Sequence, residues 1–172
     1  MMLSETQQHR GVQTQSCPIL VLGLGNILLR DEGVGVRVVE AMERVDLSPG
    51  VEIIDGATAG FDLIDVLADR RKVIVIDAID GQCEPGTVIR LTPEDLVPQG
   101  NRGVSLHEMG LLEALTAAGQ LGVAPDEVVI FGVRPNNVSC GLDLSLEIAR
   151  LVPAIIELVL AELEVTENKD EG

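Results

Sequence analysis

Short apolar runs alternating with helical patterns constrain the fold of this chain more than any other feature of its sequence. Mostly apolar residues fill positions 19–22, 51–54 and 73–76, and each run has the length of a buried strand. Helical spacing of apolar residues marks residues 34–45, and a shorter helical pattern covers residues 61–67. Because helical crossovers join parallel strands with one handedness, this β-α-β-α-β series predicts three parallel strands whose carboxyl ends share one edge of a sheet.

The second half of the chain adds further elements to this sheet. The connection before residues 87–91 is too short for a helical crossover, so this strand is predicted to pair antiparallel. The S-x-x-E spacing of a capping box predicts a helix over residues 105–118. A strand is predicted over residues 127–133 and a long final helix over residues 144–163. The sequence therefore predicts an α/β fold with a mixed sheet.

The length of 172 residues is that of one ordinary domain. Residues 1–16 and 165–172 are polar or charged and lack apolar periodicity, so both are predicted to be disordered tails of a single domain, residues 17–164. The chain is 46% hydrophobic but only 1% aromatic, which predicts an aliphatic core of the kind found in parallel sheets covered by helices. Its three cysteines are far apart without a C-x-x-C pair, so they indicate neither a disulfide framework nor a zinc knuckle.

The strongly acidic balance of the chain excludes some classes of partner. Twelve Lys and Arg residues against 28 Asp and Glu residues give a net charge of −16, which repels nucleic acid and anionic membrane surfaces. No stretch reaches the ~18 consecutive apolar residues of a membrane span, and the first residues lack the pattern of a secretory leader. We therefore expect a soluble, cytoplasmic monomer that binds neither nucleic acid nor membrane.

A glycine-rich turn follows the first predicted strand and has an unusual charge. It covers residues 23–35 and reads G-L-G-N-I-L-L-R-D-E-G-V-G. Backbone N–H groups in such a turn attract anions, yet this turn carries Asp31 and Glu32 side by side. Two acids repel a pyrophosphate, so they favour a cation or a metal ion at this place.

Three side chains of metal-binding type are predicted to meet at the carboxyl edge of the sheet. Glu32 lies in the turn after the first strand, and Asp77 closes the third strand. His107 falls in the first turn of its predicted helix, where the helix dipole disfavours protonation and leaves the imidazole available as a ligand. Two carboxylates and one imidazole suit a divalent transition metal, and the ligand types leave nickel, zinc, cobalt and manganese open.

Each of these residues also has a structural interpretation. Glu32 could stabilise the start of the following helix, and Asp77 could hydrogen-bond the loop after its strand. A lone histidine such as His107 is more often structural than a ligand. Asp55 ends the second strand at the same edge, where it could orient a ligand or hold its own glycine turn. Cys140 is a weak candidate nucleophile because no second ordered histidine is available to activate it.

Four blocks of the sequence together resemble one known family. They are Gly23-Leu24-Gly25-Asn26 through Asp31-Glu32-Gly33-Val34-Gly35, Asp55-Gly56-Ala57-Thr58, Val75-Ile76-Asp77-Ala78 and Ser105-Leu106-His107-Glu108-Met109-Gly110-Leu111. These blocks look like those of the hydrogenase maturation proteases, the endopeptidases that trim the C-terminus of the large subunit of nickel-iron hydrogenases. The resemblance extends over residues 19–163.

This resemblance implies a three-layer α/β/α fold with a mostly parallel central sheet and one antiparallel strand. It places the family's metal ligands on Glu32, Asp77 and His107. Of the two adjacent acids, Asp31 is interpreted as a helix-start residue or a support for the ligands. It also implies a precursor substrate already loaded with nickel, so that the metal acts as a checkpoint before cleavage. The second block departs from the family's D-G-G-T, because Ala57 stands in place of its second glycine.

The group that activates the attacking water stays open at this point. A metal-bound water could attack, or Asp77 or Asp55 could act as the general base. Three other functions are weighed against the protease: a dinucleotide-binding enzyme, a peptidyl-tRNA hydrolase and a nickel-dependent assembly factor without catalytic activity. Leu28 replaces the third glycine of a dinucleotide motif, and the net charge of −16 opposes binding of tRNA. The polar loops 92–104 and 134–137 are predicted to contact the substrate.

Overall fold

The protein has a five-stranded mixed sheet at its centre. The computed structural model describes residues 18–56, 63–96 and 106–170. The strands lie in the order β2-β1-β3-β5-β4, and only β4 runs antiparallel to its neighbour. Their bounds are β1 Ile19–Gly23, β2 Val51–Asp55, β3 Lys72–Ala78, β4 Val88–Leu91 and β5 Glu127–Val133.

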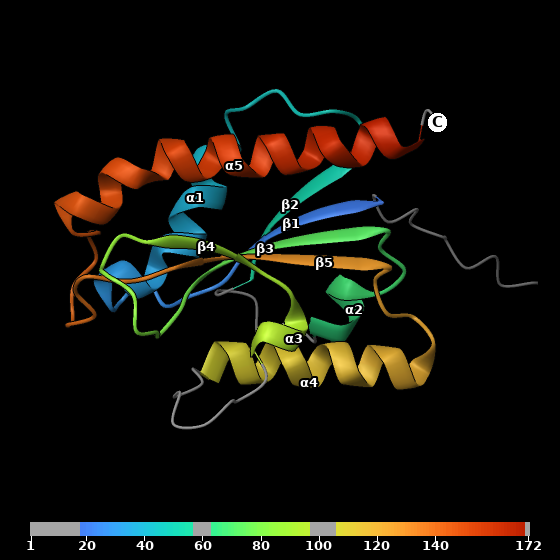
Figure 1. The fold of residues 1–172 in the computed structure, drawn as a ribbon, viewed down its shortest axis with the longest axis horizontal. Coiled ribbons are helices and arrows are strands. Elements are labelled where there is room, and N and C mark those ends of the chain that lie inside the picture. The colour runs from blue at the N-terminus through green and yellow to red at the C-terminus, as the bar shows by residue number, and fades with distance from the viewer. Residues whose placement is uncertain (1–17, 57–62, 97–105, 171–172) are drawn as a thin grey trace, which may run out of the picture.

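Helices cover both faces of this sheet and complete three layers. Figure 1 shows α1 and α5 on one face and α2, α3 and α4 on the other. Their bounds are α1 Val34–Met42, α2 Leu63–Leu67, α3 Pro93–Leu96, α4 Leu106–Leu121 and α5 Leu146–Asp170, and a short 3₁₀ helix, η1 Arg30–Gly33, precedes α1. The predicted α/β/α fold with one antiparallel strand is confirmed.

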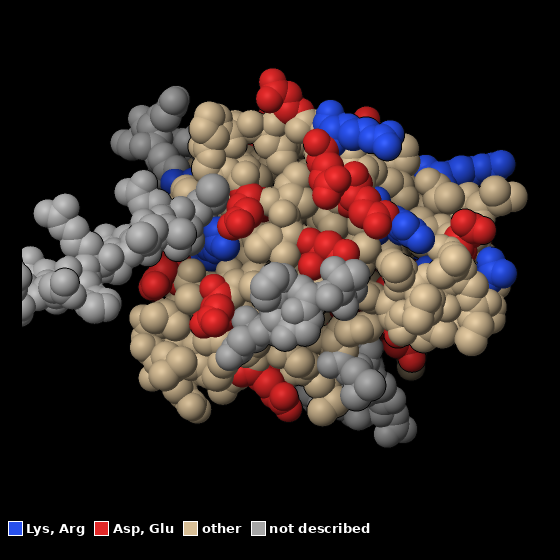
Figure 2. Space-filling view, turned by 180° about the vertical axis from the view of Figure 1, so that it is seen from behind, with Lys and Arg blue, Asp and Glu red and all other residues tan. Residues whose placement is uncertain are grey.

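The surface carries the excess negative charge expected from the composition. Acidic side chains outnumber Lys and Arg on the face shown in Figure 2. In the part of the chain that the structure describes, no helix combines the length and the apolar character needed to cross a membrane.

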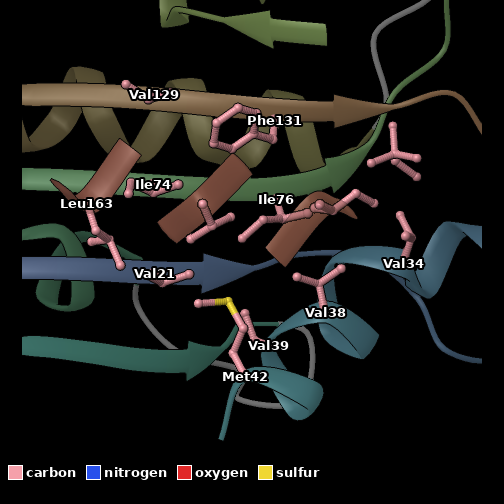
Figure 3. Close-up of a cluster of buried hydrophobic side chains, with 14 of the residues drawn as sticks. Val21, Val34, Val38, Val39, Met42, Ile74, Ile76, Val129, Phe131 and Leu163 are labelled. Atoms are coloured by element: carbon pink, nitrogen blue, oxygen red, sulfur yellow. The ribbon is translucent and has the colours of Figure 1, made fainter. Parts of the chain in front are cut away.

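Two apolar clusters flank the sheet because strand residues alternate between its faces. On β3, Ile74 and Ile76 pack in the cluster beneath α1 and α5, whereas Val73 and Val75 belong to the cluster on the α4 side. Figure 3 shows the first cluster, in which Phe131 of β5 lies among aliphatic side chains. This double burial explains why β3 reads as a continuous apolar run in the sequence.

Two details of the fold differ from the sequence-based expectation. Helix α3 forms inside the stretch expected to be a polar loop, where the carboxylate of Asp95 accepts hydrogen bonds from the backbone N–H (2.8 Å) and hydroxyl (3.0 Å) of Thr92. The final helix continues through Pro153 to Asp170, beyond its expected end at Leu163. In this added part Thr166 is buried and its hydroxyl donates to the carbonyl of Glu162 (2.9 Å), and much of the expected tail is helical.

Candidate active site

The glycine-rich turn wraps around the backbone of Glu32. Gly25 has a φ of +129°, and a Cβ at this position would lie 1.9 Å from the carbonyl oxygen of Glu32. The backbone N–H of Asn26 donates to the same oxygen over 3.2 Å. The glycine is therefore needed to let the turn close on η1, and the turn holds an acid in place rather than leaving its N–H groups free for a phosphate.

A second close approach brings the start of α1, which directly follows η1, against the end of β3. A Cβ on Gly35 would lie 2.1 Å from the carbonyl oxygen of Ile76, and the backbone N–H of Leu24 donates to that oxygen over 2.8 Å. Glu32 is half-buried in η1, and its charge is the smallest of the contributions that raise the pKa of Asp77. A direct meeting of the Glu32 and Asp77 side chains stays a prediction.

Asp77 is a buried acid in an acidic environment. Only 2% of its surface is exposed, and its Oδ1 has no hydrogen-bond partner among the described residues. Burial raises the pKa of Asp77 well above its usual value, and the nearby carboxylates of Glu108 and Glu32 raise it further, against a hydrogen bond from the backbone of Ala78. A buried carboxylate near two further acids creates a place where a cation would be stabilised.

The first turn of α4 faces the end of β3. Glu108 is buried, with 2% exposure, and its repulsion of Asp77 shows that the two side chains are near each other. His107 precedes Glu108 and is half-buried. Among the described residues, however, no three His, Cys, Asp or Glu side chains lie close enough together to hold a metal ion. The ligand set Glu32, Asp77 and His107 therefore stays a prediction.

Asp55 lies on a different side of the sheet from Asp77. It ends β2 opposite Gly23 of β1. Strand alternation places it on the face of Ile53, which packs beneath α1 and α5, whereas Asp77 shares its face with Val75 on the α4 side. Ala57, the departure from the family's second block, falls outside the described residues.

A pocket of about 440 Å³ opens beside Glu32. One wall continues from the end of β3 and another is the loop after β5, and the ion pair between Asp80 and Arg134 connects the two walls. The lining residues are Leu29, Glu32, Ala78, Ile79, Asp80, Arg134, Pro135, Asn136 and Val138. The predicted substrate loop 134–137 therefore does line a cavity next to the acids. The second predicted loop, 92–104, lies largely outside the described residues.

Asp31 has a role that the sequence interpretation missed. It is fully buried, and its carboxylate accepts hydrogen bonds from the backbone N–H groups of Asn136 (3.0 Å), Asn137 (2.7 Å) and Ser145 (2.6 Å) and from the Ser145 hydroxyl (2.9 Å). It thus anchors the loop after β5 to η1. Two adjacent acids were visible in the sequence, but the partners of Asp31 lie more than a hundred positions away, so nothing local showed which of the two acids anchors a loop.

Comparison with known proteins gives a consistent result. The model of the hydrogenase maturation protease family matches residues 36–162. The hydrogenase 2 maturation protease of Escherichia coli is 39% identical over 147 residues, which are 84% of this chain and 90% of that protein. The hydrogenase expression/formation protein HupD of Rhizobium leguminosarum is 40% identical over 149 residues, 84% of this chain and 73% of that protein.

The fold agrees with these sequence matches. The solved structure of the hydrogenase maturating endopeptidase HybD from E. coli superposes with a TM-score of 0.78 at 36% identity and covers 86% of this chain and 93% of that one. The residues matched by the family model include β3 and α4, which carry Asp77 and His107, whereas Glu32 precedes the matched range. This chain belongs to the hydrogenase maturation protease family.

Proposed function

We propose that this protein is the endopeptidase that removes the C-terminal extension from the large-subunit precursor of a nickel-iron hydrogenase. Membership of the hydrogenase maturation protease family supports the class of reaction and its substrate. The observation that carries the site is Asp77, a buried carboxylate with an unpartnered Oδ1 and two acids nearby. A chain does not keep such an arrangement for stability, because an uncompensated buried charge destabilises the fold.

We assign recognition of the nickel carried by the precursor to Glu32, Asp77 and His107. Carboxylate oxygens and an imidazole suit a divalent transition metal, and its positive charge would balance the acids around Asp77. The described residues do not by themselves form a three-ligand metal site. In this proposal the metal arrives as part of the substrate and keeps ligands from the precursor, so that cleavage waits for nickel insertion.

Asp77 is our preferred candidate for the base that takes a proton from the attacking water. Its Oδ1 has no competing donor among the described residues, and it lies at the end of β3 where the pocket wall begins. Asp55, the other candidate, belongs to the opposite face of the sheet. We therefore assign no role to Asp55 in the proton transfer.

The test compares precursor with and without nickel. The protein is incubated with each form, and the mass of the precursor is followed over time. We expect loss of a C-terminal peptide from the nickel-loaded form alone. Glu32→Gln, Asp77→Asn and His107→Ala are each expected to abolish the loss, while Asp126→Asn, an exposed acid at the start of β5, keeps it. Normal processing by the three site variants would contradict the assignment.

The same experiment separates the protease from its rivals. A non-catalytic assembly factor would bind the nickel-loaded precursor and leave its mass unchanged. A dinucleotide-binding enzyme is disfavoured by the geometry, because the turn after β1 closes on Glu32 and leaves two acids where a pyrophosphate would bind.

A further inference from the structure

Two loops near the pocket expose an unusual number of large apolar side chains. Leu28, in the loop after β1, is 59% exposed. Between β5 and α5 and at the start of α5, Val138 is 52%, Leu142 59% and Leu146 77% exposed. We call these four residues the apolar rim. Single exposed apolar residues are common, but a group of them on adjoining loops is typical of an interaction site.

The two loops are joined to each other by backbone hydrogen bonds. The N–H of Gly141 donates to the carbonyl of Leu28 over 2.9 Å, and the N–H of Arg30 donates back to Gly141 over 3.0 Å. The guanidinium of Arg37 donates to the carbonyl of Leu142 over 3.0 Å. Figure 1 shows the two segments side by side at the end of the molecule where α5 begins.

This connection makes the rim a preformed surface. Asp31 adds four hydrogen bonds that hold Asn136, Asn137 and Ser145 against η1, and Val138 and Leu146 directly follow residues of that set. A surface held in this way loses little conformational entropy when a partner binds. The partner can therefore bind these solvent-exposed apolar side chains with little loss of conformational entropy in the loops that carry them.

The rim continues into the candidate active site. Val138 belongs to the rim and also lines the pocket, and Leu29, next to Leu28, lines the same pocket. A polypeptide that reaches the pocket from this side would therefore cross the rim. The net charge of −16 argues against an anionic lipid surface as the partner.

We propose that the apolar rim binds an apolar segment of the precursor polypeptide next to the bond that is cleaved, an inference that rests on the proposed function. The rim supplies affinity for the polypeptide, and the acids at the end of β3 recognise the metal that it carries. Recognition of the protein and recognition of nickel are then separate contributions that different residues carry.

The first test replaces Leu28 and Leu142 together by Ser. We expect the KM for nickel-loaded precursor to rise about tenfold or more with kcat within about twofold of the wild type, since two apolar anchors are lost while the acids are kept. Leu121→Ser is the matched control, because Leu121 is 68% exposed at the end of α4 and is expected to leave both constants unchanged. An unchanged KM in the double variant would overturn the proposal.

A second measurement does not depend on cleavage. Cys140 is exposed in the rim loop, so its rate of alkylation reports whether that loop is covered. With the Asp77→Asn variant and excess precursor, we expect peptide-resolved alkylation of Cys140 to slow at least fivefold. The same rate with and without precursor would reject the rim as the binding surface, even if the double variant proved unstable.

Two further outcomes are distinguished by the same samples. If the wild type leaves the precursor's mass unchanged, the proposed function fails, and protection of Cys140 still decides whether the rim binds the polypeptide. If the free protein sediments as a dimer that the double substitution dissociates, the rim is a contact between copies of this chain, and the proposal is overturned.

Discussion

Strand β3 buries one charge near each of its ends, and the two are treated in opposite ways. Lys72 at its start is 1% exposed on the α5 side, and Asp77 near its other end is 2% exposed on the α4 side. Lys72 Nζ lies 2.6 Å from Glu162 and 3.2 Å from Glu127. Asp77 is near Glu32 and Glu108, and its Oδ1 has no hydrogen-bond partner among the described residues.

The buried charge of Lys72 is paired with acidic side chains of the same chain. Glu162 accepts hydrogen bonds from Lys72 (2.6 Å) and from Arg90 (2.9 and 3.0 Å). The hydrogen bond to Arg90, followed by that to Lys72, lowers the pKa of Glu162 to about 2. These charges connect α5, β3 and β4, so their role is to fix the layers of the fold.

In the Asp77 region, the buried Oδ1 of Asp77 has no hydrogen-bond partner among the described residues, and the charges of Glu108 and Glu32 raise the pKa of Asp77 further. The comparison teaches that burial of a charge does not by itself mark a functional site, since Lys72 is buried as deeply as Asp77. What differs is whether side chains of opposite charge in the same chain neutralise the buried charge. A region left incomplete is suited to a substrate that brings the missing positive charge.

The largest expected effect comes from Asp77→Asn. The folded state raises the pKa of Asp77, so folding disfavours its ionised form; this destabilisation is absent below the unfolded pKa of the carboxyl and grows as the pH rises above it. We expect processing of the nickel-loaded precursor to fall at least about 100-fold while the thermal unfolding midpoint rises. Precursor mass and calorimetry measure the two effects. A lower midpoint would show that Asp77 stabilises the fold.

Asp31→Ala extends the comparison with Asp77 to a buried acid whose carboxylate accepts four hydrogen bonds. It leaves the N–H groups of Asn136, Asn137 and Ser145 without their acceptor. We expect a loss of about 4 kcal/mol in the free energy of unfolding, and a smaller loss for Asp31→Asn, whose amide oxygen can still accept. Urea unfolding of both variants measures it. Equal stabilities for Asp31→Ala and the wild type would contradict the anchoring role.

Lys72→Ala removes the buried lysine and its ion pairs with Glu162 and Glu127. We expect a loss of about 3 kcal/mol, near the lower end for broken buried ion pairs, because Arg90 still pairs with Glu162. Processing at low temperature should remain close to wild type, because Lys72 lies at the end of β3 away from the pocket. Urea unfolding and the precursor-mass assay check both statements, and a 100-fold loss of processing in folded protein would break the proposed division of roles.

The smallest effect concerns acid stability. The folded pKa of Glu162 is about 2 against 4.5 for the free side chain, so its ion pairs contribute stability above pH 4.5 that is lost as the pH falls towards 2. Glu162→Gln should reduce the loss of unfolding free energy between pH 5 and pH 3 by about 1 kcal/mol, a value discounted for partial exposure. Urea unfolding at each pH tests this, and identical pH profiles would contradict it.

Much of the fold followed from local patterns. The apolar runs of β1, β2, β3 and β5 and the stripe of α1 were readable because each buries its own face. Helix α3 and the last turns of α5 were not predicted, because they depend on contacts such as the buried Thr166 that polar composition conceals.

The site was predicted in outline and incompletely. Glu32 and Asp77 follow from the parallel topology, which brings strand ends together. Glu108 was interpreted only as a capping residue, yet it is buried beside Asp77. Asp31 was expected to support the helix or the ligands, yet it anchors a loop 105 positions away.

By itself, the sequence determined that Lys72 and Asp77 face opposite sides of the sheet, because they stand five positions apart on a strand whose side chains alternate. The burial of both charged side chains is a finding of the structure, because a charged residue beside an apolar run can equally face solvent. Only the tertiary structure decided their partners. Glu162 reaches Lys72 across 90 positions of the chain, while α4 brings Glu108 to Asp77. Charge pairing acts through space, so local sequence patterns do not reveal which buried charge is completed within the chain and which is left for a substrate.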